Sequence, residues 1–158
     1  VLALKGIPNL AEEISINRDL YLAEYAESPV HFASISTAGS VDLIRGAKEK
    51  GMPVTCSVNL YNLVLTDDVL SSYDTRYKVM PPLRSEVDRQ SLLEGLKDGT
   101  IDAISIDHIP QDIEVKKCEF EHAAFGMRGL ETAFGIYDKY LSKEISLEKW
   151  VDLLLFHT

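Results

Sequence analysis

The feature that most constrains the fold is a regular alternation of helix-like and strand-like segments. Periodic apolar stretches predict helices over residues 9–26, 40–51, 88–99, 129–141 and 146–155, and short apolar runs predict buried strands over 31–36, 53–58 and 101–106. Helices that alternate with short buried strands are typical of βα units, which form a parallel sheet with right-handed connections. The fold class is therefore predicted as α/β.

Polar residues and glycines at the ends of these segments indicate where the helices begin and end. Ser40, Asp88 and Ser146 are the expected N-caps, because short oxygen-bearing side chains accept from the free amides of a first turn. Gly51 and Gly99 are expected just past two helix ends, where the backbone turns left-handed.

Two architectures fit this alternation. A doubly wound sheet could close within 158 residues, whereas a (β/α)₈ barrel needs about 250. No GxGxxG or GxxxxGK[ST] loop follows a predicted strand, which disfavours a nucleotide-binding sheet. The chain opens on Val1 and closes within an apolar helical pattern. We therefore expect residues 1–158 to be one partial domain from a longer chain, forming roughly half of a TIM-like barrel.

Charge and hydropathy argue against two classes of partner. Lys and Arg number 16 against 25 Asp and Glu, a net charge of −9 that repels nucleic-acid phosphates and anionic lipids. Apolar runs fall far short of the ~20 residues of a membrane span, and the start lacks a signal pattern. Cys56 and Cys118 form no CxxC motif, and Cys56 is expected to be a buried free thiol. A cytoplasmic location is expected.

Chemistry in either architecture belongs at the carboxyl ends of the strands, which here are residues 34–37, 59–62 and 107–111. Asp107 follows an apolar strand, so its carboxylate has to be solvated, paired or bound to a metal, although a strand-end Asp is also a common turn cap. His108 is expected to point away from Asp107, because neighbouring strand residues face opposite sides. From the residues alone, Asp107 is the best candidate acid.

Several different short motifs follow one another along nearly the whole chain. They include Gly6-Ile7-Pro8, Ala11-Glu12, Arg18-Asp19-Leu20, HFASIST at 31–37, KVMPPLR at 78–84, DHIP at 107–110 and FGMRGLET at 125–132. In this order they resemble the second half of a dihydroorotase, a member of the metal-dependent amidohydrolase superfamily. The resemblance implies the later strands of an amidohydrolase (β/α)₈ barrel. It also implies a role in pyrimidine biosynthesis and zinc-assisted hydrolysis of the cyclic amide of dihydroorotate.

The resemblance assigns two positions to metal chemistry. Asp107 matches the strand-end acid that shuttles a proton in the family, and it is also a possible metal ligand. Ser34 stands where the family motif His-x-x-His-x-Ser-Thr has its zinc-binding histidine. A neutral hydroxyl is a poor zinc ligand beside imidazole, so Ser34 is not expected to bind the ion.

The resemblance also assigns the substrate contacts, and most of them differ here. Met80 replaces the family Asn, Gln111 replaces the family His, and residues 59–62 (NLYN) stand where the family reads Thr-Pro-His-His. Phe125 and Gly126 are retained and match a backbone contact to the substrate ring. Each buried polar group left without a partner costs about 1–3 kcal/mol of binding.

These losses predict a non-catalytic homologue that acts as a structural partner, for example of aspartate carbamoyltransferase, as some members of the family do. Self-association is the other expected interaction, because a partial barrel exposes strand edges. The alternative is an active zinc-dependent dihydroorotase that interconverts carbamoyl aspartate and dihydroorotate. A hydrolase of altered substrate is a third hypothesis. The chain by itself is predicted to be inactive and to bind no zinc.

Overall fold

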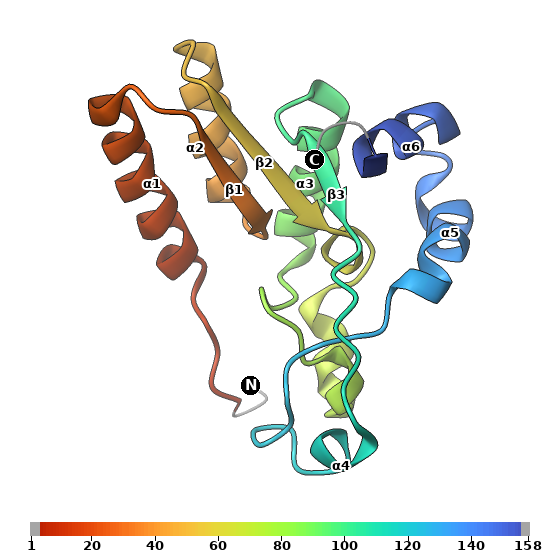
Figure 1. Cartoon of the computed structure of the whole chain (residues 1–158). Coiled ribbons are helices and arrows are strands. Elements are labelled where there is room, and N and C mark those ends of the chain that lie inside the picture. Colours follow the sequence, from red (N-terminus) through yellow and green to blue (C-terminus); the bar gives the residue numbers. More distant parts are fainter. Residues whose placement is uncertain (1–3, 156–158) are drawn as a thin grey trace.

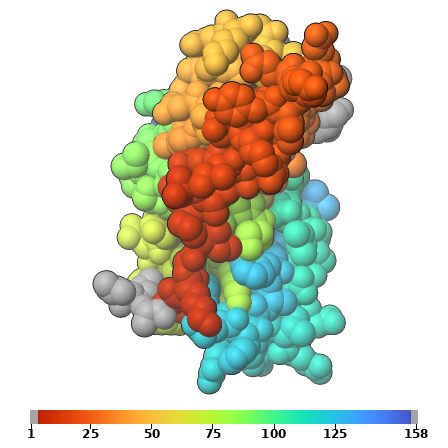
Figure 2. Space-filling model, turned by 90° about the vertical axis from the view of Figure 1, so that its left-hand side faces the viewer, coloured from red at the N-terminus to blue at the C-terminus, as the bar shows by residue number. Residues whose placement is uncertain are grey.

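The computed structural model describes residues 4–155 and has a three-stranded parallel sheet in the order β1-β2-β3 (Figure 1). The strands are β1 (Val30–Ile35), β2 (Val54–Asn59) and β3 (Ala103–Ser105), and each is preceded by a helix: α1 (Asn9–Ala26), α2 (Ala38–Glu49) and α3 (Glu86–Asp98). The predicted α/β class and parallel pairing are confirmed. Helix α1 forms the outer surface along one side of the molecule (Figure 2).

The two faces of the sheet differ in chemistry. One face buries Phe32, Cys56 and Ile104 against the helices, so the predicted burial of the Cys56 thiol is confirmed. On the opposite face His31 Nδ1 lies 2.8 Å from Thr55 Oγ1, and both residues are exposed. In a closed (β/α)₈ barrel the face away from the helices is the barrel interior, where side chains of neighbouring strands meet.

Two predicted helix starts are wrong by three residues. The α2 N-cap is Thr37, whose Oγ1 accepts from the Ser40 amide at 3.1 Å, and the α3 N-cap is Ser85, whose Oγ accepts from the Asp88 amide at 3.4 Å. Ser40 and Asp88 instead occupy the third helical position, where the Ser40 hydroxyl lies 2.7 Å from Thr37 Oγ1 and Asp88 Oδ2 accepts from Ser85 Oγ at 2.7 Å. The predicted helix end at Gly99 is confirmed, with φ of 84°.

Two long segments gather beyond the carboxyl ends of the strands: 60–85 and 106–129 (Figure 1). Three 3₁₀ helices (Leu60–Leu63, Asp67–Ser72 and Thr75–Tyr77) give the first segment its shape. Thr75 and Lys116 join the two segments, because Thr75 Oγ1 donates to the Lys116 carbonyl at 2.6 Å and Lys116 Nζ donates to the Thr75 carbonyl at 2.9 Å. We call these two segments the rim, because barrel enzymes carry their sites at this edge of the sheet.

The C-terminal part packs beside β3. Trp150 stacks on Tyr137 with ring centroids 5.0 Å apart, and the predicted cap Ser146 accepts from the Lys149 amide at 3.2 Å. Within residues 4–155, no helix combines the length and the apolarity needed to cross a bilayer. The remaining elements are α4 (Ile113–Lys116), a 3₁₀ turn (Leu130–Thr132), α5 (Ala133–Ile136), a π-helical turn (Tyr137–Leu141) and α6 (Leu147–Leu155).

Candidate functional site

Side chains from the ends of all three strands meet in one hydrogen-bonded cluster, formed by Ser34, Asn59, Tyr61 and Asp107. Ser34 Oγ donates to Asn59 Oδ1 at 2.7 Å, and Asn59 Nδ2 donates to Asp107 Oδ2 at 3.2 Å. The Tyr61 hydroxyl donates to the same Asp107 oxygen. The structure thus brings together Asp107 and Ser34, which the sequence placed at one rim, and links them through Asn59.

Ser34 and Asp107 both have strained backbones. Their φ values are 59° and 47°, in the left-handed region that residues other than glycine adopt at a cost of about 1–3 kcal/mol. Hydroxyl groups hold the amides of both residues, since Ser34 N donates to Ser57 Oγ at 3.1 Å and Asp107 N donates to Ser105 Oγ at 3.2 Å. The strained backbone turns both side chains toward the cluster.

Asp107 is subject to two opposing electrostatic effects. Burial raises the pKa of its carboxyl, because the charged form loses solvation. The donors Tyr61 and Asn59 favour the charged form and oppose that rise. His108 takes no part, because its Nδ1 accepts from the amides of Gly129 and Leu130 at 3.3 and 3.2 Å. The carboxylate is therefore held by neutral donors.

The donor set of this cluster does not suit zinc. It offers one carboxylate, one amide and two hydroxyls, whereas protein zinc sites use imidazole, thiolate and carboxylate ligands. Across residues 4–155, no three His, Cys, Asp or Glu side chains lie close enough together to hold a metal ion. Of Ser34 and Asp107, only the Asp107 carboxylate would be a strong zinc ligand.

The positions matched to substrate contacts lie on the same rim, and several are engaged within the chain. Gln111 Nε2 donates to the Phe125 carbonyl at 2.9 Å, and the Gly126 amide donates to the Lys78 carbonyl at 2.9 Å. Met80 is 46% exposed and carries no polar group. The replacement Gln111 therefore bonds to backbone that lies next to the matched contact, and the Gly126 amide already has an acceptor.

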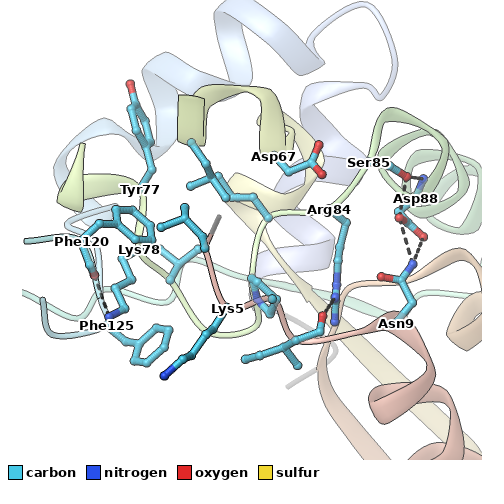
Figure 3. Close-up of a pocket in the computed structure, with 17 residues that line it drawn as sticks. Lys5, Asn9, Asp67, Tyr77, Lys78, Arg84, Ser85, Asp88, Phe120 and Phe125 are labelled. Atoms are coloured by element: carbon cyan, nitrogen blue, oxygen red, sulfur yellow. Dashed lines mark hydrogen bonds between the residues drawn. The ribbon is translucent and has the colours of Figure 1, made fainter. Parts of the chain in front are cut away.

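Figure 3 shows a cavity of about 380 Å³ whose lining includes none of the four cluster residues. Its wall includes Leu4, Ile7, Tyr77, Lys78, Phe120 and Phe125. Lys78 Nζ lies 4.9 Å from the centre of the Phe125 ring and donates to the carbonyls of Phe120 and Glu121 at 2.9 and 2.7 Å. Phe125 is the one predicted site residue in this wall, so the cavity is separate from the strand-end cluster.

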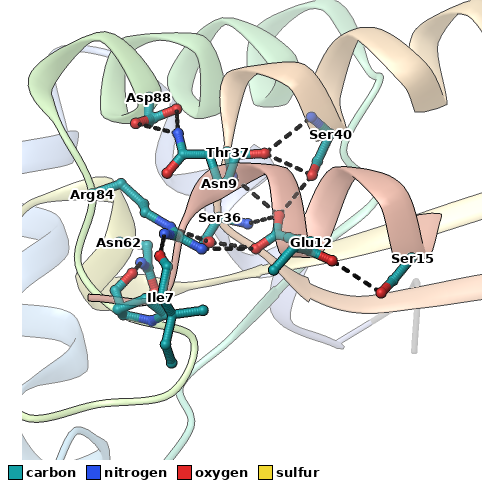
Figure 4. Close-up of polar contacts among 12 residues, drawn as sticks. Ile7, Asn9, Glu12, Ser15, Ser36, Thr37, Ser40, Asn62, Arg84 and Asp88 are labelled. Atoms are coloured by element: carbon teal, nitrogen blue, oxygen red, sulfur yellow. Dashed lines mark hydrogen bonds and ion pairs between the residues drawn. The ribbon is translucent and has the colours of Figure 1, made fainter. Parts of the chain in front are cut away.

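Sequence reasoning missed a second polar cluster, which Glu12 and Arg84 form at the base of the rim (Figure 4). Glu12 Oε1 accepts from the Ser36 amide at 2.8 Å and from Ser40 Oγ at 2.7 Å, and Glu12 Oε2 lies 3.7 Å from an Arg84 nitrogen. Arg84 also donates to the Ile7 carbonyl. Both residues stand in the short motifs of the sequence, but only the fold shows that they pair.

The role of Asn59 and Tyr61 was also missed. Both were placed at a strand end and noted as departures from a family motif but were not assigned to Asp107, whereas the structure makes them the hydrogen-bond donors to Asp107. Their position at the carboxyl end of β2 was the available signal, because neighbouring parallel strands bring their ends to one edge of the sheet.

Comparisons with known sequences show which proteins the chain is similar to. No family model matches the chain. The dihydroorotase of Thermoanaerobacter sp. (strain X514) is 50% identical over 141 residues, which cover 89% of this chain and 33% of that protein. The dihydroorotase of Leifsonia xyli subsp. xyli (strain CTCB07) is 47% identical over 152 residues, or 96% of this chain and 34% of that protein. The chain therefore spans about one third of the curated relatives that it matches.

Comparisons with solved structures give the fold to which the chain is similar. The L-hydantoinase (dihydropyrimidinase) from Arthrobacter aurescens superposes with a TM-score of 0.86 at 28% identity, over 95% of this chain and 34% of that chain. The dihydropyrimidinase from Brevibacillus agri NCHU1002 gives 0.84 at 27% identity, over 92% and 34%. With the three parallel strands and their helices, these likenesses identify the chain as a homologue of the dihydroorotases that forms part of a TIM-barrel amidohydrolase domain.

Proposed function

We propose that the chain belongs to a dihydroorotase-like pseudoenzyme of pyrimidine biosynthesis, located in the cytoplasm, that serves as a structural partner of another enzyme. The observation that carries the proposal is the cluster of Ser34, Asn59, Tyr61 and Asp107. At the rim where a barrel amidohydrolase would hold its metal and water, these polar atoms bond to one another.

Loss of metal affinity follows from the chemistry of this cluster. Tyr61 and Asn59 both donate to Asp107 Oδ2, so a zinc ion would be left with Oδ1 of a single carboxylate, and Ser34 would add only a neutral hydroxyl. Protein zinc sites use three or four strong ligands, so one carboxylate oxygen supplies only a small part of the affinity that such a site needs.

Loss of substrate affinity follows from Met80 and Gln111. The Met80 thioether cannot replace the two hydrogen-bonding groups of an asparagine amide. Gln111 directs its amide to the Phe125 carbonyl. A cyclic amide acid at this rim would meet fewer free donors than the family pattern provides.

The proposed partner is aspartate carbamoyltransferase, with self-association as the other mode of assembly. The resemblance to dihydroorotases supports this choice, since non-catalytic members of the family have that role. Sedimentation of the purified chain with and without aspartate carbamoyltransferase tests the proposal directly. We expect a faster complex of fixed stoichiometry, and independent sedimentation of the two proteins would contradict the proposed partnership.

The alternative function, an active zinc-dependent dihydroorotase, is favoured by one observation. Asp107 keeps the strand-end position of the family acid and lies at the rim with a left-handed backbone. A calorimetric zinc titration of the full-length protein and an assay of its dihydroorotate hydrolysis separate the two functions. The pseudoenzyme predicts neither a 1:1 zinc site nor turnover, whereas zinc binding and turnover that both disappear in Asp107→Asn would establish the alternative.

Ser34→His tests whether the cluster still surrounds a potential metal position. Histidine tolerates a left-handed backbone better than most residues, so the variant is expected to fold. We expect weak zinc binding that depends on Asp107, because the two side chains are separated by a single amide group. Ser28→His, on an exposed turn, is the matched control and should add no zinc affinity.

A further inference from the structure

Helix α1 is apolar on two separate sides. Ile16 and Leu20 face the core and are 5% and 8% exposed. A second set of large apolar side chains remains in solvent: Leu10 at 59%, Ile14 at 58%, Tyr21 at 67% and Tyr25 at 90% exposed. At 3.6 residues per turn these four positions fall within about 60° of one another, on a stripe turned away from Ile16 and Leu20. A helix with apolar residues on both sides is typically covered on both sides.

Helices α2 and α3 have largely polar outer faces. Exposed positions of α2 include Asp42 and Glu49, and those of α3 include Glu94 and Lys97. Figure 2 shows α1 on the surface with no other segment over it. Exposed apolar side chains also line α6, where Leu147, Val151 and Leu155 are 51%, 37% and 64% exposed, so an apolar outer face distinguishes α1 from α2 and α3 but not from α6.

The stripe does not face the side of the sheet where a further strand could pair with β1. Tyr21 lines a groove between α1 and α2 together with Leu43 and Met52. The stripe thus lies between the α2 side and the outward side of α1. A further βα unit next to β1 would meet the opposite flank of α1 and leave the stripe in solvent.

We propose that α1 pairs antiparallel with α1 of a second copy of this chain, about a twofold axis between Asn17 and Arg18. Leu10 and Tyr25 are equally far from that point along the helix, and so are Ile14 and Tyr21. A twofold axis there places Leu10 against the second copy's residue 25, and Ile14 against its residue 21. Such reciprocal contacts are the property of an isologous interface.

Charge and area are compatible with this pairing. Near the axis Asn17 is uncharged, and Arg18 Nε donates to Asp19 Oδ1 at 2.7 Å, which compensates its charge. From the exposed fractions, the four stripe residues offer at most roughly 600 Å² per copy. Stable interfaces bury about 800 Å² per partner, so the stripe supplies most of the area that a specific dimer needs.

Sedimentation velocity over a dilution series of the chain tests the proposal. We expect a reversible dimer, and we expect Tyr21→Glu to raise its dissociation constant by roughly a hundredfold, because a central aromatic residue becomes a charged one in both copies. Val87→Glu is the matched control: Val87 lies on α3 and is 74% exposed, so this variant should leave the dissociation constant unchanged. Far-UV circular dichroism verifies that both variants are folded.

Disulfide trapping tests the geometry independently, in a Cys118→Ser background that leaves Cys56 buried. Leu10→Cys mixed with Tyr25→Cys should form a disulfide-linked dimer, whereas Leu10→Cys alone should not, because its two copies would lie ~22 Å apart along the helix axis. A monomer at every concentration, association that Tyr21→Glu leaves unchanged, or self-linking by Leu10→Cys would each overturn the proposal. None of these outcomes bears on the zinc and turnover tests.

Discussion

Replacing Glu12 by glutamine should destabilise the chain by about 3 kcal/mol. The carboxylate accepts from the Ser36 amide at 2.8 Å and lies 3.7 Å from the Arg84 guanidinium, whose side chain is only 7% exposed. Removing one partner of a buried ion pair costs about 3–5 kcal/mol, because the other charge stays buried. Arg84 keeps Ser36 Oγ and the Ile7 carbonyl as acceptors, so we expect the lower end of that range.

Urea unfolding at neutral pH, followed by circular dichroism, measures this loss. Glu24→Gln is the matched control, because Glu24 lies on the same helix in an exposed position and should change the free energy of unfolding by less than about 0.5 kcal/mol. Arg84→Met combined with Glu12→Gln should cost less than the sum of the two single variants, since the two residues interact directly. A loss below about 1 kcal/mol in Glu12→Gln would refute the structural role of this cluster.

Three further predictions concern single residues. Tyr61→Phe should raise the pKa of Asp107 further, because burial persists while one donor to the carboxylate is lost; a carboxyl NMR titration that moves this pKa downward would contradict the cluster. A thiol reagent should label exposed Cys118 quickly and Cys56 only on unfolding, because burial raises the pKa of the Cys56 thiol to about 12; equal labelling rates would be inconsistent with the core described above. Gly126→Ala should cost about 1–3 kcal/mol of unfolding free energy, because φ is 130° and a Cβ would lie 2.6 Å from a backbone oxygen; a melting temperature equal to that of the parent would argue against this turn.

Much of the fold was predictable because periodicity follows from burial. The alternation of helix and strand patterns predicted the parallel sheet. The helix end at Gly99 was predictable because glycine readily adopts the left-handed backbone found there. The helix starts were displaced because Ser40 and Asp88 are good caps by residue type, yet Thr37 and Ser85 stand three residues earlier and take that role. Where two good capping residues stand three positions apart, the sequence alone does not decide at which of them the helix starts.

The candidate site was predictable only in part. Parallel strands bring their carboxyl ends to one edge, so Ser34 and Asp107 could be expected at a common rim. The donors Asn59 and Tyr61 could not be assigned to Asp107, because the 3₁₀ turn after β2 decides where their side chains point. Glu12 pairs with a residue far along the chain, and local patterns carry no information about such a contact.

The central claim is that the strand-end cluster has replaced a metal-dependent catalytic centre. The most direct test is the metal content of the protein isolated from its natural source without chelators, together with its rate of dihydroorotate hydrolysis. The account predicts zinc well below one ion per chain and no turnover above the uncatalysed rate, because neutral donors hold Asp107 and Ser34 has no imidazole. Stoichiometric zinc with measurable hydrolysis would contradict it.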